Sequence, residues 1–214
     1  MGVALVTGAS SGIGLAAARI LRARGHEVVG VSRSGREATE IADLSDEAGC
    51  ARAVELARAH GPIRMLVHSA GVGSAAEGPI EGLGEQIWRE SMDLNLDAAY
   101  RLVRLAWPDL AATPGGRIVL VASTAATMGA PGYAAYSAAK AGLLGMMRSV
   151  ALDGAPAGLT CNAVLPGWVR SEMSEQSAVR DAELAGTSVD EVWRERARSY
   201  AAGRVVEADE VGHV

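Results

Sequence analysis

Short runs of consecutive apolar residues alternate along the chain with longer stretches whose apolar positions have helical spacing. The runs of strand length are Val3–Val6, Val28–Val31, Thr39–Ala42, Ile63–Val67, Arg117–Val121 and Leu159–Val164. The helical stretches are Ile13–Arg24, Glu47–His60, Gln86–Leu110 and Tyr136–Leu152. Because continuous apolar strands that alternate with helices are typical of a parallel sheet covered on both faces, the pattern predicts one α/β domain over residues 1–214, doubly wound and of Rossmann type.

Two segments depart from this alternation. Only residues 34–38 separate the second and third predicted strands, whereas a parallel crossover normally takes a dozen residues or more. We therefore expect either an extended return across the end of the sheet, which leaves one face thinly covered, or a misplaced third strand. Residues 168–203 are polar, charged and loosely helical, with Val189–Tyr200 the strongest helix, and we expect them to form a substrate lid.

Composition and charge restrict the class of protein. The balance of 49% hydrophobic and 21% charged residues is typical of a soluble globular domain. A net charge of −5 without a Lys/Arg run argues against a nucleic-acid partner. The sequence has no apolar run of membrane-spanning length and no signal peptide, and its two cysteines, Cys50 and Cys161, are typical of buried reduced thiols. We expect a cytoplasmic protein without a membrane or metal partner.

A glycine-rich segment, Thr7–Gly14, follows the first strand and leads directly into a helix. Gly8 permits a tight turn, Gly12 lets backbone approach a pyrophosphate, and Gly14 lets the helix pack against the strand, while the N–H groups and dipole of the helix attract the anion. Glycines occupy many strand-to-helix turns for backbone reasons alone. The position of this turn after an N-terminal buried strand in an alternating chain favours a dinucleotide site.

Tyr136 and Lys140 lie four residues apart and therefore on one face of a helix. A free phenol has a pKa near 10, so a substantial phenolate fraction near pH 7 requires about 4 kcal/mol of charge stabilisation, which Lys140 and an oxidised nicotinamide ring can supply. Tyr133 is the weaker candidate because Ser137 occupies the corresponding place after it. Ser123 follows a predicted strand at the carboxyl end, where its hydroxyl can bond a substrate oxygen. The plain alternatives are an exposed Tyr–Lys pair and a serine that caps a turn.

Together these motifs resemble the short-chain dehydrogenase/reductase family, in particular its 3-oxoacyl reductase-like members, over nearly the whole chain. The family's T-G-x-x-x-G-x-G stands at Thr7–Gly14, its strand-end serine at Ser123, and its Y-x-x-x-K at Tyr136–Lys140. The Pro-Gly that follows a strand in the family stands at Pro166 and Gly167. The resemblance implies an oxidoreductase that transfers a hydride between a nicotinamide dinucleotide and a carbonyl or alcohol.

The resemblance also implies a role for individual residues. Tyr136 is the general acid in reduction and Ser123 orients the carbonyl. Lys140 lowers the pKa of Tyr136 and holds the nicotinamide ribose. Asn95 matches the helix asparagine that holds a proton-relay water. The implied cofactor-binding residues are Gly8, Ser10, Ser11, Gly12, Ile13, Gly14, Arg33, Asp43, Leu44, Ala70, Gly71, Lys140, Pro166 and Gly167.

Two features differ from the family pattern. His68 begins His-Ser-Ala-Gly where the family usually carries Asn-Asn-Ala-Gly, and we expect a structural role for it. Gly203–Val211 resembles the start of the family's last helix, which is usually followed by one more strand. That strand is missing here, so a chain that ends at Val214 would expose an apolar sheet edge, and we expect a truncated sequence.

The cofactor and the substrate class follow from a few positions. Ser32 replaces the acid that NAD-preferring enzymes carry at the end of the second strand, and Arg33 can pair with a 2′-phosphate, so NADP(H) is favoured over NAD(H). The residues expected near the substrate are mostly small or apolar: Gly73, Met128, Gly129, Trp168 and Met173. They suit a 3-oxoacyl thioester, a cyclic ketone or another secondary alcohol pair. An NAD-linked alcohol dehydrogenase and a dinucleotide-binding regulator without turnover are the alternatives.

Self-association is the last expectation. Adjacent Met146 and Met147 point in different directions from one helix, which indicates that this helix is buried on more than its sheet face. Members of the family commonly pair the helices that correspond to Gln86–Leu110 and Tyr136–Leu152. We therefore expect a homodimer or a homotetramer.

Overall fold

A six-stranded parallel sheet forms the centre of the molecule in the computed structural model, which describes residues 2–73, 77–112 and 115–214. The strands are β1 (Val3–Thr7), β2 (Glu27–Ser32), β3 (Glu40–Ile41), β4 (Ile63–His68), β5 (Arg117–Val121) and β6 (Thr160–Val164). Their order is β3-β2-β1-β4-β5-β6, and every neighbouring pair is parallel. All six predicted strands are confirmed. The strand order reverses between β1 and β4, the point at which open α/β sheets bind ligands.

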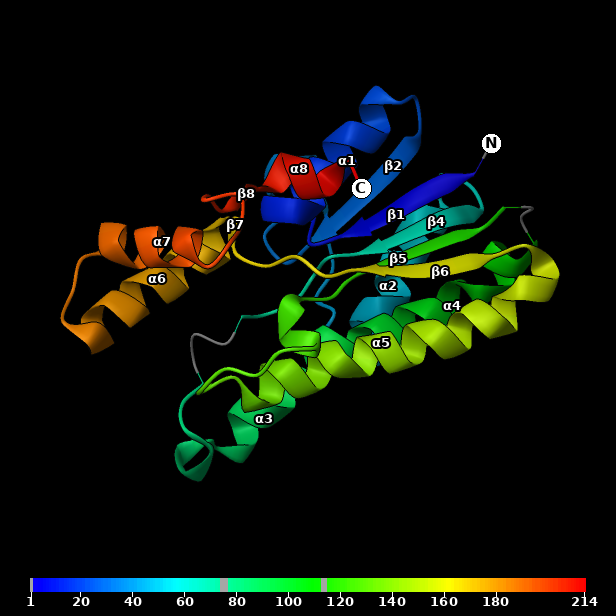
Figure 1. Ribbon diagram of the computed structural model, residues 1–214. Coiled ribbons are helices and arrows are strands. Elements are labelled where there is room, and N and C mark those ends of the chain that lie inside the picture. The colour runs from blue at the N-terminus through cyan, green and yellow to red at the C-terminus, as the bar shows by residue number, and fades with distance from the viewer. Residues whose placement is uncertain (1, 74–76, 113–114) are drawn as a thin grey trace.

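Helices cover both faces of the sheet, which confirms the doubly wound class. They are α1 (Gly12–Ala23), α2 (Glu47–Arg58), α3 (Glu85–Met92), α4 (Ala98–Ala112), α5 (Ala134–Gly154), α6 (Glu172–Ala185), α7 (Val189–Arg198) and α8 (Ala208–Gly212). In Figure 1, α2, α4 and α5 lie on one face, and α1 lies on the other with α8 against it. The contact between α8 and α1 is close, since a Cβ on Gly212 would come within 3.1 Å of Ala16. The described helices include none that is both long and apolar enough to cross a membrane.

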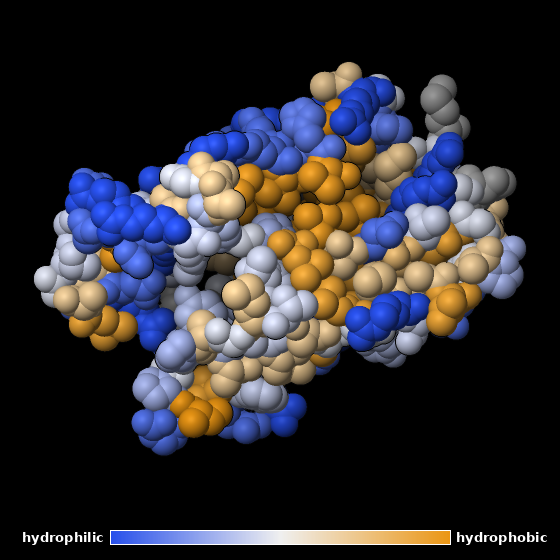
Figure 2. Space-filling model, viewed as in Figure 1, coloured by the Kyte–Doolittle hydropathy of each residue, from blue (hydrophilic) through white to orange (hydrophobic). Residues whose placement is uncertain are grey.

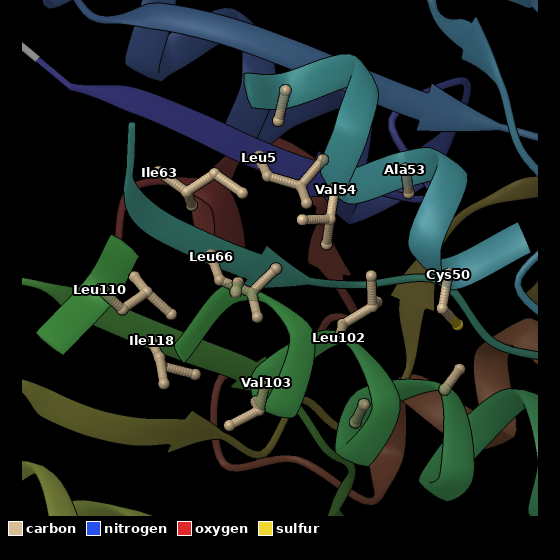
Figure 3. Packing of buried hydrophobic residues seen from close by; sticks show 14 of the residues in the cluster. Leu5, Cys50, Ala53, Val54, Ile63, Leu66, Leu102, Val103, Leu110 and Ile118 are labelled. Carbon is tan, nitrogen blue, oxygen red and sulfur yellow. The ribbon is translucent and has the colours of Figure 1, made fainter. Parts of the chain in front are cut away.

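The main hydrophobic core lies between the sheet and the helices of the first face. Figure 3 shows Leu5, Leu66 and Ile118 of the sheet directed toward α2 and α4, and all three are fully buried. Cys50 and Cys161 are buried as free thiols, as predicted. Burial raises the pKa of both to about 11, so neither is a thiolate nucleophile at neutral pH.

The other face of the sheet is covered unevenly. Ala4, Val6 and Ala18 form a small buried cluster beneath α1. Toward β6, the strand residues on the same face are only half-buried: Met65, Val67, Val119 and Val164. Figure 2 shows hydrophobic residues gathered over the strands between α8 and α5. β6 forms one edge of the sheet and β3 forms the other.

The predicted helix Gln86–Leu110 is not continuous. It consists of α3, a π-helical turn η4 (Asp93–Asp97) and α4. A π-helical turn holds more residues than an α-helical one and interrupts the regular spacing of side chains. The interruption buries Asn95 completely within the turn, which the apolar pattern of the sequence did not indicate.

The short connection between β2 and β3 is neither an extended return nor a sign of a misplaced strand. It curls through Gly35, which has φ +64°, into a 3₁₀ turn η1 (Arg36–Ala38). β3 is only two residues long and pairs with the last residues of β2, Val31 with Glu40 and Ser32 with Ile41. Because β3 begins beside the end of β2, the chain needs no crossover along the sheet.

The segment predicted as a lid forms a small unit beyond the carboxyl ends of the strands (Figure 1). Its helices are α6 and α7, of which only α7 was delineated in the sequence, as Val189–Tyr200. A short parallel pair joins its ends, β7 (Val169–Arg170) and β8 (Val206–Glu207). The unit has a hydrophobic cluster of its own, built on Ala178, Trp193 and Val205.

Candidate active site

The β1–α1 turn has the shape that a phosphate needs. Gly8 and Gly12 have φ values of +67° and +52°, in the region that favours glycine. A Cβ on Gly14 would come within 2.4 Å of the carbonyl oxygen of Gly8, so the helix can start this close to the strand only with glycine there. Ser11 makes no side-chain cap bond, and the first turn of α1 carries no acid. The N–H groups at this helix end are therefore available to an anion such as a pyrophosphate.

Thr7 links this turn to the end of β4. Its hydroxyl oxygen accepts hydrogen bonds from the backbone N–H of Ser69 (3.2 Å) and of Ala70 (3.1 Å) and lies 3.0 Å from Nδ1 of His68. The Thr7 hydroxyl and Nδ1 of His68 therefore share a buried hydrogen bond, while Nε2 of His68 is buried without a partner among the described residues. His68 is fully buried, and burial lowers its pKa to about 3. A neutral His68 thus fixes the backbone beside Gly71, which agrees with the structural role expected of it.

The structure brings Tyr136, Lys140 and Ser123 together at the carboxyl end of β5. Nζ of Lys140 lies 5.6 Å from the ring centre of Tyr136 and donates a hydrogen bond to the carbonyl of Val121 (2.9 Å). Lys140 is only 5% exposed, so the pair is not an ordinary surface contact. Ser123 accepts a bond from the N–H of Ala125 (3.1 Å) and caps the turn η5 (Thr124–Ala126). Its hydroxyl also faces the phenol.

Burial dominates the acid–base properties of this group. It lowers the pKa of Lys140 to about 8 and raises the pKa of Tyr136. A hydrogen bond from Ser123 acts against the rise at Tyr136, whereas the charges of Tyr133 and Glu77 add to it. The net direction is opposite to the lowering by Lys140 that the motif implies, because burial of the phenol outweighs the hydrogen bond that stabilises its charged form. Tyr136 therefore stays protonated at neutral pH, the state of a proton donor.

Asn95 lies next to this group. Its amide nitrogen donates to the carbonyl of Val72 (3.1 Å) and to the hydroxyl of Ser91 (3.4 Å). Among the described residues its buried Oδ1 has no hydrogen-bond partner. A Cβ on Gly71 would lie 2.4 Å from this oxygen and 3.6 Å from Nζ of Lys140. An orphaned acceptor beside an ammonium is a suitable place for an ordered water molecule.

The residues expected at the adenosine end surround the β2–β3 turn. The Ser32 hydroxyl is used inside that turn, 2.7 Å from the Thr39 hydroxyl. Arg33 is exposed beside it. Asp43 is also exposed and accepts a bond from the N–H of Ser45 (3.1 Å), while Leu44 is buried.

Pro166 and Gly167 follow β6 and lie beside the Ser123 turn. The carbonyl of Pro166 accepts a hydrogen bond from the N–H of Thr124 (3.0 Å). A Cβ on Gly167 would lie 2.1 Å from the hydroxyl oxygen of Tyr200, so the lid approaches the site closely here.

The residues expected around the substrate are only partly brought together. Met173 of α6 packs on Gly73, where a Cβ would lie 3.0 Å from its side chain. Gly129 lines a cavity of about 460 Å³ beside Tyr133 and Ser137. Met128 is 67% exposed, and Trp168 packs inside the lid, 3.6 Å from the guanidinium of Arg196. Figure 2 shows the molecule hollowed between the lid and the body.

Two residues of the site were missed in the sequence. Arg36 on η1 forms an ion pair with Glu172 of α6 (3.1 Å) beside Arg33. Glu77 is 4% exposed, and its carboxylate accepts hydrogen bonds from the backbone N–H of Ala135 (3.0 Å) and of Tyr136 (2.9 Å). Neither position carried a signal, because an Arg in a turn and a Glu in a glycine- and alanine-rich loop are ordinary surface residues.

Comparison with known proteins agrees with this geometry. The family model for short chain dehydrogenase matches residues 2–182. The 3-oxoacyl-[acyl-carrier-protein] reductase FabG of Escherichia coli is 34% identical over 197 residues, which cover 86% of this chain and 79% of the relative. The D-beta-hydroxybutyrate dehydrogenase of Cupriavidus necator is 32% identical, covering 98% of this chain and 87% of the relative.

A solved structure extends the similarity to the fold. A variant of actinorhodin polyketide ketoreductase with NADPH has a TM-score of 0.91 and 29% sequence identity, covering 99% of this chain and 87% of its own. Fold, motif geometry and relatives agree. The chain belongs to the short-chain dehydrogenase/reductase family, as an NAD(P)-dependent oxidoreductase that acts on CH–OH or C=O groups.

Proposed function

We propose that the protein reduces a ketone to a secondary alcohol with NADPH, and that Tyr136 donates the proton. One observation carries this proposal: a protonated phenol lies beside the Ser123 hydroxyl and the Lys140 ammonium, at the sheet end where the glycine-rich turn is open to phosphates. In the opposite direction, Tyr136 must first lose its proton, and its phenolate is then the base that takes the alcohol proton.

Each group has a distinct part in the proposed mechanism. Ser123 donates a hydrogen bond to the carbonyl oxygen and so orients it, while Tyr136 delivers its proton to the same oxygen. Lys140 binds the ribose hydroxyls of the nicotinamide half. Asn95 holds a water near Nζ of Lys140, through which the phenol regains its proton from solvent. When bound, the dinucleotide supplies the hydride in reduction and takes it up in oxidation.

The other residues proposed to bind the cofactor lie in the β1–α1 turn and in the segments that follow β3, β4 and β6. The N–H groups at the start of α1, from Gly12 to Gly14, bind the pyrophosphate, and Ser10 and Ser11 flank it. Ala70 and Gly71 permit the close backbone approach at the end of β4. Asp43 and Leu44 would hold the adenine, and Pro166 and Gly167 would hold the nicotinamide.

The preference for NADP(H) over NAD(H) is supported by the β2–β3 turn. No acid stands at the end of β2, and the β2–β3 turn carries two arginines, the exposed Arg33 and Arg36, which is paired with Glu172; a guanidinium can pair with a 2′-phosphate. Similarity to a ketoreductase that was solved with NADPH supports the same cofactor. An NAD-linked alcohol dehydrogenase is the second candidate, favoured by the similarity to D-beta-hydroxybutyrate dehydrogenase.

The substrate class that we propose is the 3-oxoacyl thioester. The cavity beside Tyr133 is lined mainly by glycine, alanine, proline and isoleucine, which suit an acyl chain. The similarity to a 3-oxoacyl-[acyl-carrier-protein] reductase supports this class over cyclic ketones. We assign the segment 168–203 as the lid over the substrate.

The proposal extends to assembly and location. A groove of about 330 Å³ lies between α4 and α5 and is lined by Tyr100 and Trp107 of α4 and by Met146 and Val150 of α5. These are the helices expected to pair, and we propose a homodimer or homotetramer built on them. We place the protein in the cytoplasm, which the two buried free thiols support.

A cofactor and substrate panel tests the function. Purified protein is assayed with a 3-oxoacyl thioester, cyclic ketones and the matching alcohols, each with NADPH, NADH and their oxidised forms. We expect turnover of the thioester, with kcat/KM about ten-fold or more higher for NADPH than for NADH, because a phosphate–arginine pair is worth about 1.5–3 kcal/mol. Arg33→Ala should remove most of this preference, whereas Arg24→Ala, an exposed arginine at the other end of α1, should not. Dinucleotide binding without turnover of any substrate would favour the silent regulator.

A further inference from the structure

We propose that Glu77 is a positioning residue for Tyr136: its carboxylate caps the first turn of α5 and fixes the backbone from which the phenol projects. The consequence for turnover rests on the function proposed above. The cap itself does not, because it is a property of the fold.

Helix α5 needs a partner at its N-terminus. Its N-cap residue is Tyr133, which makes no side-chain cap bond, and its first turn carries no acid. The first N–H groups of a helix have no partner within it, and serine, threonine, aspartate or asparagine at the cap usually satisfies one of them. α5 lacks this local solution at the end that carries Tyr136.

Glu77 supplies the cap from a distant part of the chain. One carboxylate oxygen accepts from the N–H of Ala135 (3.0 Å) and the other from the N–H of Tyr136 itself (2.9 Å). Two bonds from one rigid carboxylate fix the orientation of the turn as well as its position. Both are charge-assisted and lie at the positive end of the helix dipole. Since Glu77 is 4% exposed, water does not compete for them.

The main chain of Glu77 is held from the other side. Its carbonyl oxygen accepts a hydrogen bond from the guanidinium of Arg180, which belongs to the lid helix α6. The lid and the catalytic helix therefore meet at one residue. A shift of α6 reaches Tyr136 through two successive contacts, Arg180 to Glu77 and Glu77 to the first turn of α5.

The charge of Glu77 favours the protonated form of Tyr136, which is the form that the proposed function requires. The groups that face the phenol are Ser123, Tyr133, Lys140 and Glu77, and the carboxylate of Glu77 raises the pKa of Tyr136. Burial raises the pKa of Glu77, whereas the two N–H bonds and the charge of Arg180 lower it, and burial has the larger effect. The ionised cap helps to keep Tyr136 protonated.

Hydrogen exchange of α5 tests the cap directly. In Glu77→Ala the amides of Ala135 and Tyr136 lose their acceptors, and we expect them to exchange about ten-fold faster or more, with the middle of α5 unchanged. Glu77→Gln keeps one acceptor oxygen and should fall between wild type and Glu77→Ala. Glu85→Gln is the matched control: it neutralises an exposed glutamate on the first turn of α3 and should leave these amides unchanged.

Kinetics then test the consequence for Tyr136. We expect Glu77→Ala to lower kcat about ten-fold or more while KM for NADPH changes much less, because most of the proposed dinucleotide contacts lie on the β1–α1 and β2–β3 turns and not on the first turn of α5. In alcohol oxidation, Glu77→Gln should move the acidic limb of the pH profile to lower pH, since the phenolate no longer faces a negative charge. A residue that only stabilises the fold would lower the amount of active protein without moving kcat per active site or the pH profile.

The outcomes separate the two proposals. Unchanged exchange at Ala135 and Tyr136 in Glu77→Ala would overturn the cap, whatever the enzyme does. Faster exchange with unaltered kcat and pH profile would overturn the positioning role. A wild-type protein that turns over no substrate would defeat the proposed function, while the exchange measurement would still decide the cap.

Discussion

Lys140 brings a positive charge into a part of the protein that solvent hardly reaches. It is the only lysine in the sequence, and within the structure it is 5% exposed and donates to the Val121 carbonyl. Burial lowers its pKa to about 8, against an ordinary value of 10.5. The folded protein therefore carries an electrostatic cost at neutral pH in order to hold an ammonium beside Tyr136.

The pH dependence of this cost follows from the two pKa values. Below pH 8 both the folded and the unfolded protein hold the proton, and the cost is fully present. Between about pH 8 and 10.5 the folded state binds fewer protons than the unfolded state, so stability rises with pH. Above that range the lysine is neutral in both states, and the cost is gone.

Lys140→Met should therefore stabilise the protein at neutral pH. We expect a gain of up to about 3 kcal/mol in the free energy of unfolding at pH 7, reduced by the hydrogen bond lost at Val121 and shrinking toward pH 10.5. Urea unfolding at pH 7 and pH 10 measures it. A single labelled-lysine NMR signal that titrates above pH 10 in the wild type would contradict this account, as would a mutant that is less stable at pH 7.

The sequence identified those site residues that belong to short local motifs. Tyr136 and Lys140 share one helix, Ser123 follows a strand, and the glycines form one turn after another strand. Each of these motifs is visible locally, and their proximity follows once the strand order is known. Glu77 and Arg36 could not be found in this way. Their partners, the N-terminus of α5 and Glu172 of α6, are distant in sequence, and only the folded chain brings them into contact.

Among the elements, the lid depends on one buried cation. Arg196 of α7 is 6% exposed and donates to the carbonyl of Ser174 (3.0 Å) and to the carboxylate of Asp181 (2.8 Å). Its guanidinium also lies 3.6 Å from the ring centre of Trp168 and 4.8 Å from that of Trp193. Only a planar, multiply donating cation can stack and bond in this way.

Arg196→Lys should loosen the lid without unfolding the sheet. The lysine keeps the charge but loses the stacking and part of the bonding, at a cost of about 2 kcal/mol. Because the cluster around Trp193 is separate from the main core, we expect faster hydrogen exchange confined to residues 172–198. An equal rise in exchange across the central strands would show instead that lid and sheet unfold as one unit.

Element prediction succeeded where the hydrophobic pattern is strong. Short, mainly apolar runs identified every strand of the six-stranded sheet, although Glu40 interrupts the run at β3 and Arg64 the run at β4. The pattern failed at α6, since Glu172–Ala185 is an amphipathic helix packed mainly on the lid and carries a weak apolar face. It also could not show the π-helical turn at Asn95, because apolar spacing does not report a single inserted residue.

On the scale of the whole molecule, the groove between α4 and α5 is the surface that we expect a second copy to cover. Tyr100 lies in the groove and is 53% exposed, and Leu184 is an apolar residue on α6, 75% exposed and remote from the groove. The two positions therefore form a matched pair for testing the assembly.

Sedimentation velocity should show the wild type as a dimer or tetramer and Tyr100→Asp as a monomer, because a charge buried in an interface loses its solvation. Leu184→Asp should sediment like the wild type. A monomeric wild type, or equal effects of the two substitutions, would show that this groove is not the interface.

The central claim concerns a single proton on the hydroxyl of Tyr136. Tyr136→Phe removes it and leaves the ring, the lysine and the glycine-rich turn in place. NADPH-dependent reduction of a 3-oxoacyl thioester should then fall by about 10²–10⁴-fold, the range of general acid catalysis, while the dissociation constant for NADPH stays unchanged. Turnover close to that of the wild type, with NADPH bound equally well, would contradict Tyr136 as the proton donor.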